Sequence, residues 1–141
     1  MDPTQAICNY ALLRFIPYPQ TGELVNVGVV VNCIQPCLLN FLAEETMPAR
    51  VKALFPDYDA SAFAAVVDAM RKDLERIDGR IRGAKDCQFA FNELVRPREN
   101  TFRFGEVRTA VTADPQNLAE VLFRRYVRME STAPQVVGKQ D

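Results

Sequence analysis

The sequence predicts an α+β domain in which a largely antiparallel sheet of about four to five strands has helices packed on one face. Two observations support this prediction. Near the N-terminus, alternating apolar runs flank a turn-forming segment and predict a β-hairpin over residues 9–32. Farther along, strand patterns are followed by helical patterns instead of alternating with them, which favours an antiparallel sheet. The expected order of elements is β-β-β-α-α-(β)-β-α.

The hairpin is the segment against which the other elements are expected to pack. Its loop contains Pro17, Pro19 and Gly22, which oppose a continued strand. If Ile16 faces Leu24, the alternation of side chains separates an apolar face from a polar one. The further expected pairs are Arg14 with Asn26, Leu12 with Gly28, and Tyr10 with Val30. The apolar face then carries Ala11, Leu13, Phe15, Val25, Val27, Val29 and Val31, and the other face carries Arg14, Asn26, Gly28 and Asn32.

Three more elements follow the hairpin in the first two thirds of the chain. A third strand is expected over residues 37–43, and a short helix is expected to start at Pro48, since proline is tolerated in a first turn. Asp59 or Ser61 then caps a long amphipathic helix. Its apolar stripe, at spacings of three and four, consists of Phe63, Val66, Val67, Met70, Leu74, Ile77 and Ile81.

The last third of the chain is expected to contain strands, one helix and a tail. Residues 86–94 alternate weakly and are predicted as a strand, with a short helix as the alternative. Residues 101–112 predict a strand with a bulge at Gly105. Asp114-Pro115 is typical of a helix start, whereas residues 131–141 have no periodicity and predict a disordered tail. A single domain over residues 1–130 is expected.

Composition restricts the class of protein. The 141 residues are 48% apolar and 25% charged, which is ordinary for a globular domain. No apolar run approaches the roughly 18 residues that span a bilayer, and the start of the chain lacks a basic signal-like region, so a cytoplasmic location is expected. In that compartment Cys8, Cys33, Cys37 and Cys87 are expected to be free thiols, because disulfides are rare there.

Two segments resemble a known family. The runs NYALLRFIPYPQTGELVNVGVVV and FRFGEVRTAVTADPQNLAEVLFRRYV look like the bacterial domain-of-unknown-function family 3037, and the similarity extends from about Asn9 to Arg128. The resemblance implies no established activity. It implies a protein partner, because members are often encoded beside a HipA-like kinase. The family pattern falls here on Arg14, Gly22, Glu23, Asn26 and Gly28.

Arg14, Glu23 and Asn26 form the first candidate site. A charged residue in an apolar strand needs a partner or solvent, because an unpaired buried cation costs several kcal/mol. Arg14 could bind a carboxylate or phosphate of a partner, with Gly28 leaving room for close approach. The alternative is structural, with Arg14 holding the hairpin loop through Glu23.

Arg96, Arg98, Arg103 and Arg108 form the second candidate site. Arginines interleaved with Phe102 and Phe104 could bind single-stranded nucleic acid by charge and stacking. However, the net charge of −1 lacks the basic excess of most nucleic-acid-binding proteins, and both rings are expected in the core. The cluster of Arg124, Arg125 and Arg128 is expected to be a solvated end of a helix.

Catalytic and metal motifs are not found in the sequence. The chain has no histidine, so histidine-based triads and metal sites are excluded, and no phosphate-binding glycine loop is present. Four cysteine thiolates could bind zinc, but their spacing lacks a second short knuckle. An enzyme that uses carboxylates such as Glu23, Glu44 and Glu45 on a phosphate-containing substrate is the weakest alternative.

The sequence therefore predicts a small, non-catalytic interaction module that binds a protein partner and no metal or cofactor. The candidate partner is a kinase-like protein. Nucleic-acid binding through residues 96–108 is the alternative. No membrane association is expected, and the sequence leaves the oligomeric state open.

Overall fold

The central strand of the sheet is β1 (Ala6–Phe15), which has partners along both edges. In the computed structural model, β1 pairs with β2 (Val25–Cys33) on one side. On the other side it pairs with β4 (Phe102–Phe104) and then with β5 (Arg108–Thr112), while β3 (Leu38–Ala43) extends the sheet beyond β2. All of these pairs are antiparallel, which confirms the predicted α+β class.

The described residues are 5–97 and 100–130. The predicted tail, residues 131–141, lies outside them, and so does Arg98.

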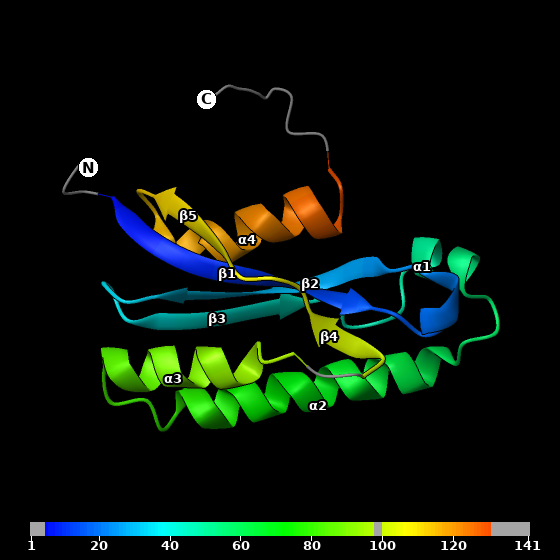
Figure 1. The fold of residues 1–141 in the computed structure, drawn as a ribbon, viewed down its shortest axis with the longest axis horizontal. Helices are drawn as coiled ribbons and strands as arrows, with labels where there is room; N and C mark the ends of the chain where they lie inside the picture. The colour runs from blue at the N-terminus through cyan, green and yellow to red at the C-terminus, as the bar shows by residue number, and fades with distance from the viewer. Residues whose placement is uncertain (1–4, 98–99, 131–141) are drawn as a thin grey trace.

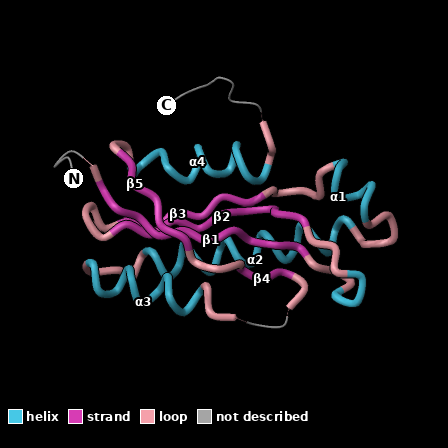
Figure 2. Tube along the Cα trace, turned by 45° about the horizontal axis from the view of Figure 1, so that its top comes forward, coloured by secondary structure: helices cyan, strands magenta, loops and turns pink. Residues whose placement is uncertain are grey.

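Helices lie on both faces of the sheet. The prediction that helices pack on one face therefore describes only part of the arrangement. α2 (Ala60–Asp78) and α3 (Ala84–Leu94) lie on one side. α4 (Leu118–Leu122) and the π-helical turn that follows it (Phe123–Val127) lie on the other (Figure 1, Figure 2). α1 (Ala49–Leu54) packs at the end of the sheet that holds the hairpin loop. The second helical layer is needed because β1 and β2 present apolar side chains on both faces.

A β-bulge explains how β2 serves both layers. Arg14 pairs with Asn26, as predicted, but Leu13 pairs with Gly28, so Val27 is an extra residue on β2. Beyond the bulge the pairing shifts by one, and a shift of one residue exchanges the two faces of a strand. Val29 and Val31 were predicted to share the face of Val27, and this was wrong. They pack instead with Cys8, Tyr10, Leu118, Leu122 and Phe123 on the α4 side.

The opposite face contains the largest aromatic cluster. Leu13, Phe15 and Val27 of the hairpin pack against Val51 of α1, Phe55 directly after α1, Phe63 and Val67 of α2, and Phe102 of β4. α2 begins at its predicted cap, where the Asp59 carboxylate accepts a hydrogen bond from the Ser61 N–H at 2.9 Å. Buried Phe63, Val67 and Leu74 follow the predicted stripe.

Residues 86–94, predicted as a strand, belong instead to the helix α3. Its buried residues, Cys87 and Phe91, are four positions apart and therefore lie on one helical face. Phe89 is 68% exposed, although the strand interpretation would place it on the same face as Cys87 and Phe91. The short alternation is thus compatible with the period of a strand and with that of a helix. Packing against β2 and β3 stabilises the helix.

Candidate functional site

Three polar residues stand side by side across three adjacent strands. Arg14 of β1 lies directly opposite Asn26 of β2 on one edge and opposite Arg103 of β4 on the other. Directly opposite residues on one face have Cβ atoms about 4.5–5.5 Å apart. These three residues, called the arginine row below, point away from the aromatic cluster, because neighbouring Leu13, Phe15 and Phe102 belong to that cluster.

The arginine row has no acidic partner among the residues that the structure describes. The guanidinium groups of Arg14 and Arg103 form no ion pair or hydrogen bond within the described residues, and both arginines are partly exposed. The Nε atoms of Arg14 and Arg103 and the Oδ1 atom of Asn26 are buried without a hydrogen-bond partner. Asn32 Oδ1 is the one other such atom in the described part of the chain. Since buried polar groups are nearly always hydrogen-bonded, their clustering in one row is unusual.

Glu23 does not neutralise this row. It lies exposed in the hairpin loop, and its side chain has no bond to Arg14 in the described structure. The loop is closed locally instead, with Thr21 Oγ1 donating to the Tyr18 carbonyl at 2.9 Å. The contact between Arg14 and Glu23, which was predicted as the structural alternative, is therefore not present.

Gly105, between β4 and β5, gives Arg14 its position. A Cβ atom on Gly105 would lie 2.7 Å from Arg14 Cζ and 2.9 Å from its Nε, so the guanidinium rests directly on the glycine backbone. The Gly105 N–H donates to the Leu12 carbonyl at 2.9 Å, and this bond keeps the segment between β4 and β5 close to β1. The sequence identified Gly105 only as a bulge, because the side chain above it comes from a distant strand.

A third arginine, outside the row, fixes the Asn26 end of the row. Arg50 of α1 donates to the Asn26 carbonyl at 3.1 Å and to the Val127 carbonyl at 2.7 Å. The Asn26 side-chain amide donates to the Tyr126 carbonyl at 3.4 Å. These bonds tie the π-helical turn to β2, and π-helical turns are frequent at functional sites.

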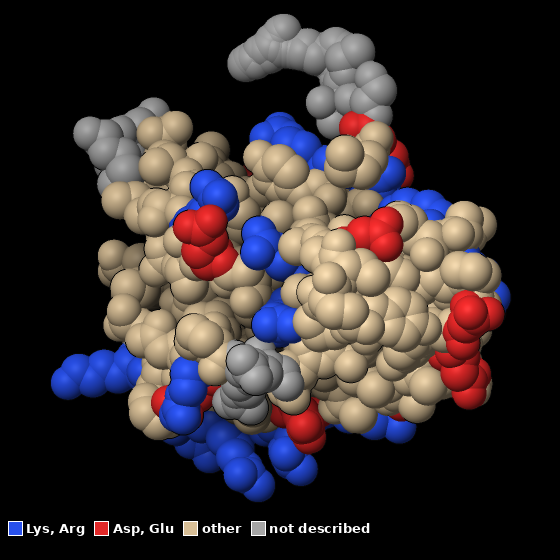
Figure 3. Space-filling model, turned by 45° about the vertical axis from the view of Figure 1, so that its right-hand side comes forward, with Lys and Arg blue, Asp and Glu red and all other residues tan. Residues whose placement is uncertain are grey.

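The carboxylate of Glu44 is the acidic group nearest to this end in the described contacts. Its oxygens lie 3.7 Å from Arg50 and 3.5 Å from Arg128, so it is already shared by two cations. Figure 3 shows several Lys and Arg side chains along the middle of one face of the molecule, with Asp and Glu side chains beside some of them.

Gly28 does not belong to the row. The bulge places it opposite Leu13, and a Cβ on it would lie 2.9 Å from the Leu42 carbonyl oxygen of β3. Gly28 thus allows β2 and β3 to approach closely, and the structure gives it a packing role in place of the predicted position beside Arg14.

The four arginines of the predicted nucleic-acid segment are not one surface in the described structure. Arg103 belongs to the arginine row. Arg96 is paired with Glu93 at 2.6 Å, and hydrogen bonding to that carboxylate raises the pKa of Arg96. Arg108 is paired with Glu106 at 3.3 Å. Arg98 lies outside the described residues.

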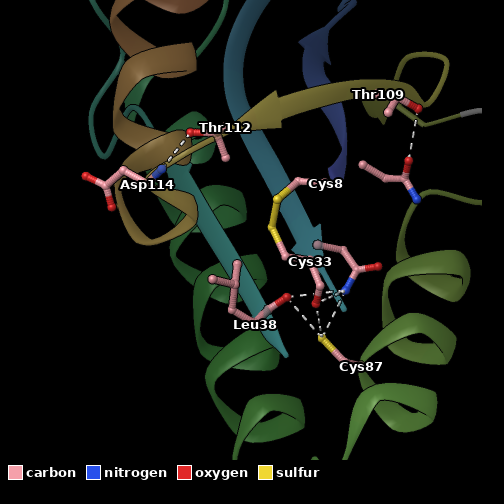
Figure 4. The surroundings of a disulfide bond; sticks show 9 residues. Cys8, Cys33, Leu38, Cys87, Thr109, Thr112 and Asp114 are labelled. Carbon is pink, nitrogen blue, oxygen red and sulfur yellow. Dashed lines mark hydrogen bonds between the residues drawn. A yellow bond between two sulfur atoms is a disulfide. The ribbon is translucent and has the colours of Figure 1, made fainter. Parts of the chain in front are cut away.

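The cysteines gather at the opposite end of the hairpin. Cys8 and Cys33 face each other across β1 and β2, with Cα atoms 4.4 Å apart, and form a disulfide (Figure 4). The expectation of four free thiols was therefore wrong for this pair. Its physical reason is the register shift, which brings the two side chains together on the α4 face. A zinc site of four thiolates is not formed, and the described residues contain no group of three or more potential ligands.

Cys87 of α3 is a buried thiol. It donates to the Leu38 carbonyl at 3.0 Å, and the Asn32 amide donates to its sulfur at 3.0 Å. Burial, together with the nearby Cys37 thiol, raises the pKa of Cys87 to about 12. Since the thiolate is the reactive form, this cysteine should be inert at neutral pH.

Alkylation should distinguish the two thiols. In the folded protein at pH 8 without reductant, we expect iodoacetamide to modify exposed Cys37 and to leave Cys87 unmodified, because its raised pKa keeps it protonated. Mass spectrometry should find one adduct on the folded chain and two in denaturant. Two adducts formed at similar rates on the folded chain would contradict the burial of Cys87.

No helix of the described residues is long and apolar enough to cross a membrane.

These features define an α+β domain whose sheet carries a pair of arginines without an acidic partner among the described residues. A family model described as "Protein of unknown function (DUF3037)" matches residues 10–127. The chain belongs to this family, as the resemblance of its hairpin and C-terminal segments predicted. Comparisons with curated proteins and with solved structures gave no match.

Proposed function

We propose that this domain is a non-catalytic binding module that contacts a protein partner through the arginine row. The observation that supports the proposal is the direct juxtaposition of Arg14 and Arg103 without an acidic partner in the described structure. Like charges directly opposite each other destabilise a pair of strands. Local arrangements of this kind, which oppose stability, are typical of functional sites.

The other two functions receive less support from the contacts. Nucleic-acid binding through residues 96–108 would need free cations in a series, but Arg96 and Arg108 are each paired with a glutamate. The carboxylate-dependent enzyme would need converging acids. Glu44 is instead paired with arginines, and Glu23 is exposed in the loop.

The partner is also part of the proposal. The kinase-like protein that the family resemblance suggests is the first one to test. A cytoplasmic location rests on the sequence, and it implies that Cys8 and Cys33 are thiols in the cell, because that compartment reduces most disulfides.

Substitution of Arg14 should separate a binding role from a structural one. We expect Arg14→Ala to reduce capture of the natural partner at least ten-fold, since a charged contact at an interface is worth about 2 kcal/mol or more. The free energy of unfolding should change by less than about 1 kcal/mol, because the substitution also removes the repulsion from Arg103. The measurements are affinity capture from native cells with quantitative mass spectrometry, and urea unfolding.

Arg108→Ala is the matched control for this experiment. Arg108 is an exposed arginine on the neighbouring strand β5 and has its own partner in Glu106. Its loss should leave capture unchanged. Equal capture by wild type and by folded Arg14→Ala would remove the arginine row from the interface.

A further inference from the structure

We infer that the arginine row binds a phosphate monoester dianion carried by a side chain of the partner protein. This inference rests on the proposed function and specifies the chemistry of the contact.

The charge of the site favours a dianion. Arg14 and Arg103 are two permanent cations on directly opposite residues, and the described structure gives neither of them a counter-charge. A carboxylate carries one negative charge and would leave one cation uncompensated. A phosphate monoester carries close to two at neutral pH, because its second pKa is about 6, so a single group can neutralise both guanidinium groups.

The donors of the site also suit phosphate. A guanidinium offers its N–H groups as a planar fork that matches two oxygens of a phosphate. The Arg14 guanidinium lies against Gly105, in the space that a Cβ there would need, and this contact limits the orientation of its fork before a ligand binds. Both arginine side chains are partly exposed, so an anion can reach them from solvent.

Asn26 indicates that the phosphate is attached to a peptide. Its amide N–H donates to Tyr126, while its Oδ1 is a buried acceptor without a donor. A phosphate monoester dianion offers only acceptors and cannot itself satisfy this atom. A phosphorylated side chain comes with backbone N–H groups next to it, and one of them can donate to Oδ1 once the buried Asn26 amide turns toward the ligand.

The same observations argue against a nucleic-acid backbone. Each phosphodiester is a monoanion, so binding to a strand depends on several cations spaced along it. The neighbouring arginines Arg96 and Arg108 are neutralised by Glu93 and Glu106. Two adjacent cations flanked by paired ones suit one doubly charged group better than a chain of singly charged groups.

The test is a titration of the whole protein with small probes, followed through the arginine Nε–H resonances in NMR spectra. The probes are N-acetyl-phosphoserine methylamide, dimethyl phosphate as a monoanionic diester, and sodium acetate. We expect the phosphoserine probe to shift the resonances of Arg14 and Arg103 and to bind at least ten-fold more tightly than the other two. Its affinity should fall about ten-fold from pH 7.5 to pH 5, as the dianion is protonated.

Gly105→Ala is the most specific variant for this test. The new Cβ would occupy the place of the Arg14 guanidinium, which can move because it is the end of a flexible side chain. We therefore expect the fold to be retained and the affinity for the phosphoserine probe to fall at least ten-fold. Arg14→Lys keeps the charge and removes the fork, and should give an intermediate loss. Arg108→Ala should bind like wild type.

Three results would overturn the inference. Equal affinity for acetate would show a carboxylate site, and tighter binding of dimethyl phosphate would show a backbone site. Absence of any shift at Arg14 and Arg103 would also reject the dianion. If partner capture still depended on Arg14 in these cases, the proposed binding module would stand while the phosphate inference failed.

Discussion

Replacement of Phe15 by alanine is expected to lower the free energy of unfolding by about 3–5 kcal/mol, the range for deletion of a fully buried ring. The side chain is 0% exposed. Its ring centroid lies 4.9 Å from those of Tyr58 and Phe102, 5.1 Å from Phe63 and 5.6 Å from Phe55. Loss of this ring would leave a cavity between β1, β4, α1 and α2 that rigid neighbours cannot fill.

Urea unfolding followed by circular dichroism measures this effect. Phe89→Ala is the matched control, because Phe89 is 68% exposed on α3, and its loss should change the free energy of unfolding by less than about 0.5 kcal/mol. A destabilisation below 1.5 kcal/mol for Phe15→Ala would contradict the packing described for the aromatic cluster.

Phe15 also shows why part of the fold was predictable. It faces Val25 in the predicted register, since the loop and the alternation fix the pairing at this end of the hairpin. Beyond Val27 the alternation of side chains no longer predicts which residues share a face, because β2 has valines on both faces. A bulge then costs no burial, and the observed register is the one that packs Val29 and Val31 against α4.

The candidate site was predictable in pieces for a similar reason. Arg14 and Asn26 belong to one hairpin, so local pairing placed them together. Arg103 was assigned to a different candidate site, because the sequence does not reveal that β4 pairs with β1. The position of Gly105 beneath the Arg14 guanidinium follows from the same long-range pairing, which periodicity cannot predict.

Loss of the Cys8–Cys33 disulfide is expected to lower the free energy of unfolding by about 3 kcal/mol. The bond closes a sequence separation of 25 residues, and the chain-entropy model assigns about 3–4 kcal/mol to a loop of this length. A double Cys8→Ala, Cys33→Ala variant and the reduced wild-type protein should show this loss. Cys37→Ala, which removes an exposed thiol, should not.

Reduction should weaken the fold without changing the arginine row. The disulfide joins β1 and β2 at the end opposite to Arg14 and Asn26, and distant sites usually contribute independently. We therefore expect the reduced, folded protein to bind the phosphoserine probe as the oxidised protein does. Acid quenching of intact cells, followed by alkylation in denaturant, then tests the compartment, because Cys8 and Cys33 are buried in the folded chain. Alkylated Cys8 and Cys33 would support the proposed cytoplasmic location, and unmodified ones would contradict it. The comparison requires that the reduced protein is folded, with a free energy of unfolding above about 2 kcal/mol without denaturant. A fall in the affinity for the probe on reduction would then mean that the two ends of the hairpin are coupled.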